Sequence, residues 1–97
     1  MLTKNDIVKT IRENMEEIKG YGIRKIGIFG SAVTGSSTER SDIDILVEFQ
    51  KDKKAFDNYM ELKFFLEHLF NRKVDLVIKD ALKSRIKDNV LKEVSYA

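Results

Sequence analysis

The chain has 97 residues, 42% of them hydrophobic, which suffices for one small domain with a single core and leaves no room for a second. Its 18 basic and 16 acidic residues nearly cancel to a net charge of +2, a balance that does not predict a dedicated nucleic-acid binder. The absence of cysteine excludes disulfides and thiolate zinc sites. The first twenty residues hold no continuous apolar stretch typical of a signal peptide or membrane span, so we expect one cytoplasmic domain over residues 1–97.

The first half of the chain predicts a helix, a strand and a loop. A capping-box variant at Thr3 and Asp6 begins an apolar pattern with helical spacing that continues to Gly20. Residues 23–29 are short and rich in isoleucine, which predicts a buried strand. Residues 31–40 are small and polar, so we expect a loop with room for one helical turn.

The second half predicts two further strands and two helices. We expect the strands at 42–49 and 73–78 and the helices at 55–71 and 81–95. The order of elements predicts an α/β or α+β fold, with a mixed sheet of three to four strands packed against helices. Phenylalanines on the long helix make its apolar stripe wider than one packing face requires, so we expect part of the stripe to contact a partner or a second copy of the chain.

Three aspartates lie on the last two predicted strands among apolar neighbours. Asp42 and Asp44 share one strand face, and Asp75 lies on the following strand. Each alone is more often a surface carboxylate at a strand end. Together they form a set of like charges that lose hydration and repel, which a divalent cation would compensate. Oxygen ligands without cysteine favour Mg²⁺ or Mn²⁺ over zinc, and Mg²⁺ commonly shares its shell with substrate phosphates.

Gly30 and Ser31 precede the aspartates and suit phosphate binding. Glycine allows a ligand to approach the backbone closely, and backbone amides together with a serine hydroxyl can hold phosphate oxygens. Ser31 also suits the N-cap of a helix, and the two roles are compatible. Residues 30–36 read GSAVTGS, which is similar to a P-loop, but the lysine that a P-loop requires is missing and we reject that interpretation.

At these residues the chain resembles the minimal nucleotidyltransferases of the DNA polymerase beta superfamily. The family pattern is Gly-Ser, ten residues, then Asp-x-Asp, and it reads here from Gly30-Ser31 to Asp42-Ile43-Asp44 without a gap. Asp75, in the segment KVDLVI, stands where the third family carboxylate is expected. The likeness covers nearly the whole chain and implies the small nucleotidyltransferase fold.

The resemblance implies an enzyme that transfers AMP from ATP to a hydroxyl acceptor and releases pyrophosphate. In that mechanism Asp42 and Asp44 would hold two Mg²⁺ ions, and Asp75 would help bind the metal near the acceptor hydroxyl and assist its deprotonation. Gly30 and Ser31 would hold the β- and γ-phosphates.

Small relatives of this kind are antitoxins in HEPN/MNT toxin-antitoxin pairs, in which the antitoxin adds AMP to a tyrosine of the HEPN toxin. The resemblance therefore implies ATP and a HEPN toxin as partners, with self-association also open. Two alternatives remain at this stage. One is an antitoxin that binds nucleotide but only blocks its toxin, and the other is a transferase for a small molecule or an RNA end.

The chain departs from the family pattern in the loop after Gly-Ser. Many relatives carry Ala-Arg-Gly there, whereas this chain has Val33-Thr34-Gly35 and lacks the arginine. Arg40, just before the aspartates, is the candidate replacement cation for binding the triphosphate, although it also reads as a solvated surface residue.

Overall fold

The computed structural model describes residues 3–34, 42–53 and 56–97, and its centre is a four-stranded sheet in the order β3-β2-β1-β4. The strands are β1 (Ile23–Phe29), β2 (Ile43–Phe49), β3 (Val74–Ile78) and β4 (Ser95–Tyr96). β1 is antiparallel to both β2 and β4, and β2 is parallel to β3. The predicted mixed sheet with helices is confirmed.

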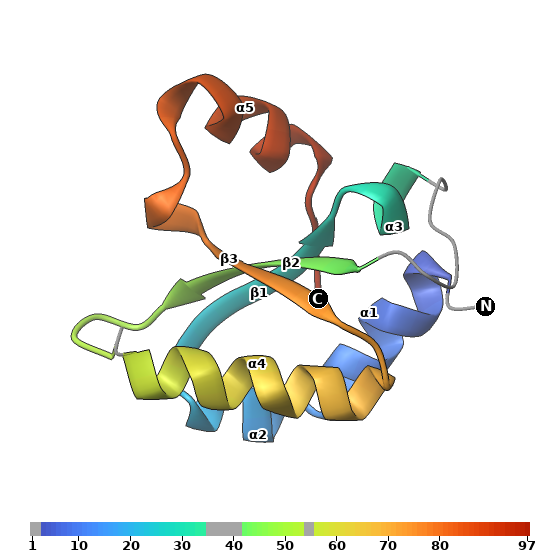
Figure 1. Ribbon diagram of the computed structural model, residues 1–97, viewed down its shortest axis with the longest axis vertical. Coiled ribbons are helices and arrows are strands. Elements are labelled where there is room, and N and C mark those ends of the chain that lie inside the picture. Colours follow the sequence, from blue (N-terminus) through green and yellow to red (C-terminus); the bar gives the residue numbers. More distant parts are fainter. Residues whose placement is uncertain (1–2, 35–41, 54–55) are drawn as a thin grey trace.

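Helices lie on both faces of this sheet (Figure 1). They are α1 (Lys4–Glu13), α2 (Met15–Gly20), α3 (Ser31–Thr34), α4 (Phe56–Phe70) and α5 (Ser84–Glu93), with a 3₁₀ turn at Lys79–Ala81. Figure 1 places α1, α2 and α4 on one face and α5 on the opposite face. No helix in the described ranges combines the length and apolar character that crossing a membrane requires.

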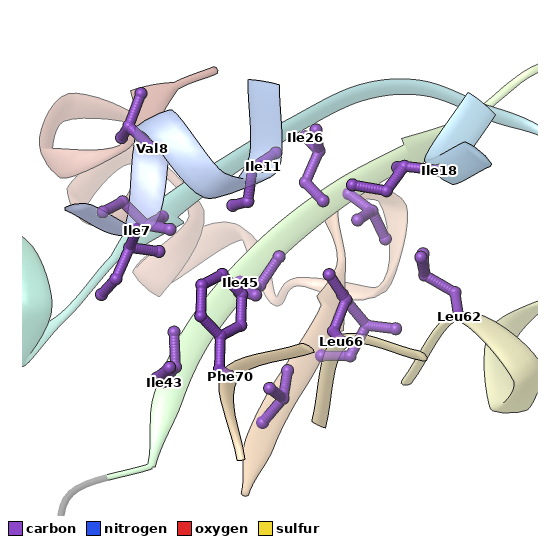
Figure 2. Packing of buried hydrophobic residues seen from close by; sticks show 14 of the residues in the cluster. Ile7, Val8, Ile11, Ile18, Ile26, Ile43, Ile45, Leu62, Leu66 and Phe70 are labelled. Atoms are coloured by element: carbon purple, nitrogen blue, oxygen red, sulfur yellow. The ribbon is translucent and has the colours of Figure 1, made fainter. Parts of the chain in front are cut away.

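The hydrophobic core lies between the sheet and the layer formed by α1, α2 and α4. Figure 2 shows side chains from these helices meeting the strand residues Ile26, Ile43 and Ile45. The fully buried side chains that the helices contribute include Ile7, Ile11, Ile18, Leu62 and Leu66. Burying branched aliphatic side chains of this kind contributes about 1.5 to 3 kcal/mol each before the entropy cost. α5 has no buried residue and lies outside this core.

The N-terminal helical pattern forms two helices rather than the single helix predicted. The capping box at Thr3 and Asp6 is present as expected. The break falls at Asn14, whose side-chain amide donates to the Thr10 carbonyl at 2.8 Å and whose backbone leaves helical geometry (φ −112°, ψ 15°). Asparagine competes in this way with the regular helical bonds, and a new helix begins at Met15.

α4 buries part of its phenylalanine stripe and exposes the rest. Phe70 is buried, whereas Phe56 and Phe64 are 76% and 59% exposed. The prediction that the stripe exceeds one packing face is therefore confirmed. Contact of the exposed part with a partner or a second copy stays a prediction.

The C-terminal segment ends in a strand that the sequence pattern did not predict. Instead of continuing to residue 95, the last helix ends at Glu93, and β4 pairs Ser95 and Tyr96 with Ile28 and Gly27. Gly27 makes this approach possible: a Cβ atom there would lie 2.9 Å from the Ser95 carbonyl oxygen. The absence of a side chain at Gly27 thus allows the C-terminal segment to close against β1.

We therefore expect Gly27→Ala to destabilise the protein by about 1 to 3 kcal/mol, because the new methyl group would push against β4 backbone atoms that cannot rotate away. Chemical denaturation measures the change. Gly20→Ala is the matched control, because a Cβ there meets nothing within 4 Å and should leave stability unchanged or raise it by up to about 1 kcal/mol. Equal stability of Gly27→Ala and the wild type would contradict the close approach.

Candidate active site

Two of the predicted aspartates face each other across the parallel pair β2 and β3. Asp44 and Asp75 are register partners. The Ile43 amide donates to the Lys73 carbonyl at 3.0 Å and joins the starts of the two strands, and the Val74 amide donates to Glu67 Oε2 of α4 at 3.0 Å and holds the start of β3 against that helix. The register thus places the two aspartates side by side at the edge of the sheet where β2 and β3 begin.

Asp44 has a pKa that departs clearly from the ordinary value of an aspartate. Burial, followed by the negative charges of Asp75, Asp42 and Glu93 and a side-chain hydrogen bond with Asp75, raises its pKa from 3.8 to about 6. Every one of these causes disfavours the charged form of Asp44. A half-buried carboxyl surrounded by other carboxyls is the environment that a bound cation would stabilise.

Gly30 stands against Asp44 in a backbone conformation that suits glycine. Its φ is +71°, and a Cβ atom there would lie 3.0 Å from Asp44 Cγ and closer still to the carboxylate oxygen Oδ2. Any side chain at this position would therefore displace the Asp44 carboxylate. The glycine of the Gly-Ser pair is therefore required here by its contact with Asp44.

Glu93 is a fourth carboxylate at this site, and the sequence reasoning missed it. The Gly30 amide donates to Glu93 Oε1 at 2.7 Å, a contact that spans 63 positions of the chain. Glu93 is the last residue of α5, and β4 directly after it carries the chain back to β1. The segment Val94 to Tyr96 is the sequence signal that could have predicted the return of the chain to β1, which brings Glu93 to this site. That segment is equally typical of the end of a helix.

The remaining predicted residues are placed as follows. Asp42 is exposed and immediately precedes β2, and Asp75 is exposed on β3. Ser31 is the first residue of α3, directly after Gly30. Arg40 lies outside the described residues.

The donor chemistry of the site fits a hard divalent cation. As the side chains stand, no group of three or more acidic, histidine or cysteine residues within 3–34, 42–53 and 56–97 is arranged to hold a metal ion. Asp44 and Asp75 nevertheless adjoin, and the charge of Asp42 acts on Asp44. These are oxygen donors with a mutual repulsion that Mg²⁺ would relieve, so we retain the three aspartates as candidate ligands.

Asp44→Asn should stabilise the folded protein at neutral pH. Because the pKa of Asp44 is higher in the folded than in the unfolded chain, the folded protein loses stability as the pH rises from about 4 to about 6, keeps that loss above about pH 6, and has no such loss below about pH 4. The neutral amide avoids this cost, so we expect a gain of roughly 1 to 3 kcal/mol above about pH 7 that fades on acidification. Denaturant titrations at several pH values measure it, and a gain that persists at low pH would contradict the proposed cause.

Glu93→Gln should lower the pKa of Asp44 towards its ordinary value. The substitution removes one negative neighbour, while the side-chain oxygen of glutamine can still accept the hydrogen bond from Gly30. Carbon-13 NMR of the carboxyl groups during a pH titration measures the shift. Glu13→Gln, which changes an exposed glutamate on α1, is the control. An unchanged Asp44 titration in Glu93→Gln would show that the two carboxylates do not interact.

Sequence comparison places this site within a described family. The family profile described as a nucleotidyltransferase domain matches residues 8–97. The protein adenylyltransferase MntA of Thermococcus cleftensis is 42% identical over 97 residues, which covers 99% of this chain and 97% of that protein. The resemblance noted from the Gly-Ser and Asp-x-Asp pattern is confirmed.

Structural comparison gives the same result. A crystal structure of a toxin-antitoxin with AMP-PNP has a TM-score of 0.69 and 27% identity to this chain, and the match covers 98% of this chain and 72% of that one. The chain also matches a structure of the tri-AMPylated HEPN toxin of Shewanella oneidensis in complex with its MNT antitoxin. The TM-score is 0.59 and the identity is 25%, over 96% of this chain and 66% of the matched chain.

Proposed function

Because the chain belongs to the nucleotidyltransferase domain family, we propose that it is a protein adenylyltransferase that moves AMP from ATP to a tyrosine hydroxyl of a HEPN toxin and thereby acts as the antitoxin. The observation that carries the proposal is the convergence of Asp44 and Asp75 beside Gly30. The named activity of the Thermococcus relative and the AMPylated toxin bound to the Shewanella antitoxin support the acceptor class. The use of ATP as substrate also favours a location of the protein in the cytoplasm.

In the proposed reaction the tyrosine oxygen attacks the α-phosphorus of ATP. The bond from that phosphorus to the bridging oxygen breaks, pyrophosphate leaves, and the hydroxyl proton is lost to a base. Asp75 is suited to accept this proton or to orient the hydroxyl, because it is exposed and adjoins Asp44. A tyrosine that reaches this edge of the sheet would therefore meet a carboxylate and the phosphate together.

Asp42 and Asp44 are the residues we propose to hold Mg²⁺, with Asp75 contributing next to the acceptor. When bound, the ions would supply charge neutralisation for the triphosphate and the leaving pyrophosphate. The raised pKa of Asp44 supports the assignment, since this carboxyl is held among like charges that a cation would separate.

The phosphate-binding role falls to Gly30 and Ser31. The Gly30 amide already donates to Glu93, so a triphosphate has to displace that carboxylate before it can use the same amide. Ser31 follows directly and offers a hydroxyl at the start of α3. We propose Arg40 as a further cation for the triphosphate, in place of the arginine that this chain lacks in its loop.

The function is tested by incubating the protein with Mg²⁺, ATP labelled on the α-phosphate and the HEPN protein encoded next to it. We expect label on a tyrosine of the HEPN protein, located by mass spectrometry. A stable complex without transfer would favour the alternative of an antitoxin that only binds, and transfer to a small molecule or an RNA end would replace the acceptor.

Asp44→Asn should reduce transfer by about 100-fold or more, because it removes a charge that we place against the metal and triphosphate. Loss of folding cannot explain this loss, since the same variant is expected to be more stable at neutral pH. Asp57→Asn, which removes an exposed carboxylate on α4, is the matched control and should keep wild-type activity. Full activity of Asp44→Asn would remove it from the mechanism.

A further inference from the structure

A cationic groove lies apart from the candidate active site, at the other end of β1. The groove encloses about 510 Å³ and receives side chains from α1, α2, β1 and the C-terminal segment. Its four charged lining residues are all basic: Arg12, Lys19, Arg24 and Lys25. Gly30 follows the last residue of β1, whereas Arg24 and Lys25 lie near its first residue, so the groove and the active site occupy different ends of the strand.

The four cations are not neutralised by the described part of the chain. The ion pairs found there join Lys9 to Glu13 and Lys79 to Glu48, and neither includes a residue of the groove. All four groove cations are exposed. Lys25 instead lies over the ring of Tyr96, with its Nζ 5.6 Å from the ring centroid. A concentration of unpaired positive charge in a chain with a net charge of only +2 marks this face as distinct from the rest.

The remaining lining of the groove is apolar. It consists of Met15, Ile26, Tyr96 and Ala97. Ile26 is buried, and Tyr96 is 39% exposed and presents an aromatic ring beside the cations. An apolar and aromatic centre surrounded by arginine and lysine is the composition of a protein interface with a polar rim, in which tyrosine and arginine are frequent anchors.

A second hollow of about 530 Å³ shares Arg12 with the groove, and its lining also includes Asn5, Val8, Lys9 and Glu13. Lys9 and Glu13 pair with each other, so Arg12 is the cation that the second hollow adds to the charge of the groove. The two hollows together offer apolar contacts as well as charge, which suits a segment of a protein better than a single small anion held only by exposed side chains.

We propose that the cationic groove docks an acidic segment of a partner protein. This rests on the proposed function for the identity of the partner, which is the HEPN protein that the enzyme modifies. Charge complementarity identifies the segment as rich in aspartate and glutamate, with an apolar side chain that packs beside Tyr96. Docking at one end of β1 holds the partner while its tyrosine reaches the carboxylates at the other end.

A nucleic acid is the competing occupant, and the structure favours it less. The net charge of the whole chain is small, and half of the residues that line the groove are uncharged. A single aromatic residue lines the groove, whereas single-stranded nucleic acids are usually bound on several stacking rings. The test therefore includes RNA as a separate measurement.

The test is the double charge reversal Arg24→Glu/Lys25→Glu, with binding to the purified HEPN protein measured by calorimetry. We expect the complex to weaken by about tenfold or more, and the wild-type complex to weaken as salt rises from about 0.05 M to about 0.5 M. In transfer assays the KM for the HEPN protein should rise by a similar factor, whereas kcat and ATP binding stay unchanged. Lys83→Glu/Arg85→Glu, at the start of α5, changes the net charge equally and should bind like the wild type.

A second double variant distinguishes the loss of positive charge from a folding defect in β1. Arg12→Glu/Lys19→Glu carries the reversal on α1 and α2 instead, and thermal unfolding establishes that each variant is folded. Wild-type affinity in either folded double variant would overturn the proposal. Loss of binding to a labelled 20-nucleotide single-stranded RNA, with the protein complex unchanged, would also overturn it and reassign the groove to RNA. Because wild-type transfer is measured separately, failure of the docking site and failure of the proposed activity are distinguishable.

Discussion

The accumulation of negative charge at one edge of the sheet is the constraint on which the rest of the site depends. The parallel register of β2 and β3 sets Asp44 opposite Asp75, and the fold adds Asp42 and Glu93 to the same field. This arrangement disfavours the ionised form of Asp44 and is retained because the hydrophobic core on the other side of the strands stabilises it. Sites that hold strained or repelling groups in this way are commonly functional, and a cation with a bound triphosphate would complete the charge balance here.

The Gly30 to Glu93 hydrogen bond connects this charged edge to the C-terminal segment. Glu93 reaches the amide because β4 returns the chain to β1, and β4 approaches because Gly27 has no side chain. Gly27 lies within β1 and Gly30 directly follows it, so the two glycines act at different points of one assembly. Gly27 leaves room for the C-terminal strand, and Gly30 leaves room for the Asp44 carboxylate and donates its amide to Glu93. Under the proposed function, nucleotide binding and the position of the C-terminal segment are coupled through the same amide.

The sequence predicted the main elements because their signals are local. Helical spacing of apolar residues, the isoleucine-rich strand and the alternation around Asp42 and Asp44 each depend on near neighbours in the chain. The break at Asn14 was not predicted, because an asparagine inside an apolar helical pattern is tolerated in many helices and its side chain decides the outcome. β4 was not predicted, because two residues carry too little pattern to separate a strand from the end of a helix.

The sequence by itself determined the candidate groups of the site, which are three aspartates and a Gly-Ser pair at a fixed spacing, and the family resemblance that both comparisons bear out. Only the tertiary structure decided which of these groups adjoin. It set Asp44 beside Asp75, added Glu93 across 63 positions, and gathered four cations from three elements into one groove. The physical reason is that charge and hydrogen bonding act through space, whereas a sequence pattern records only the order of residues along the chain.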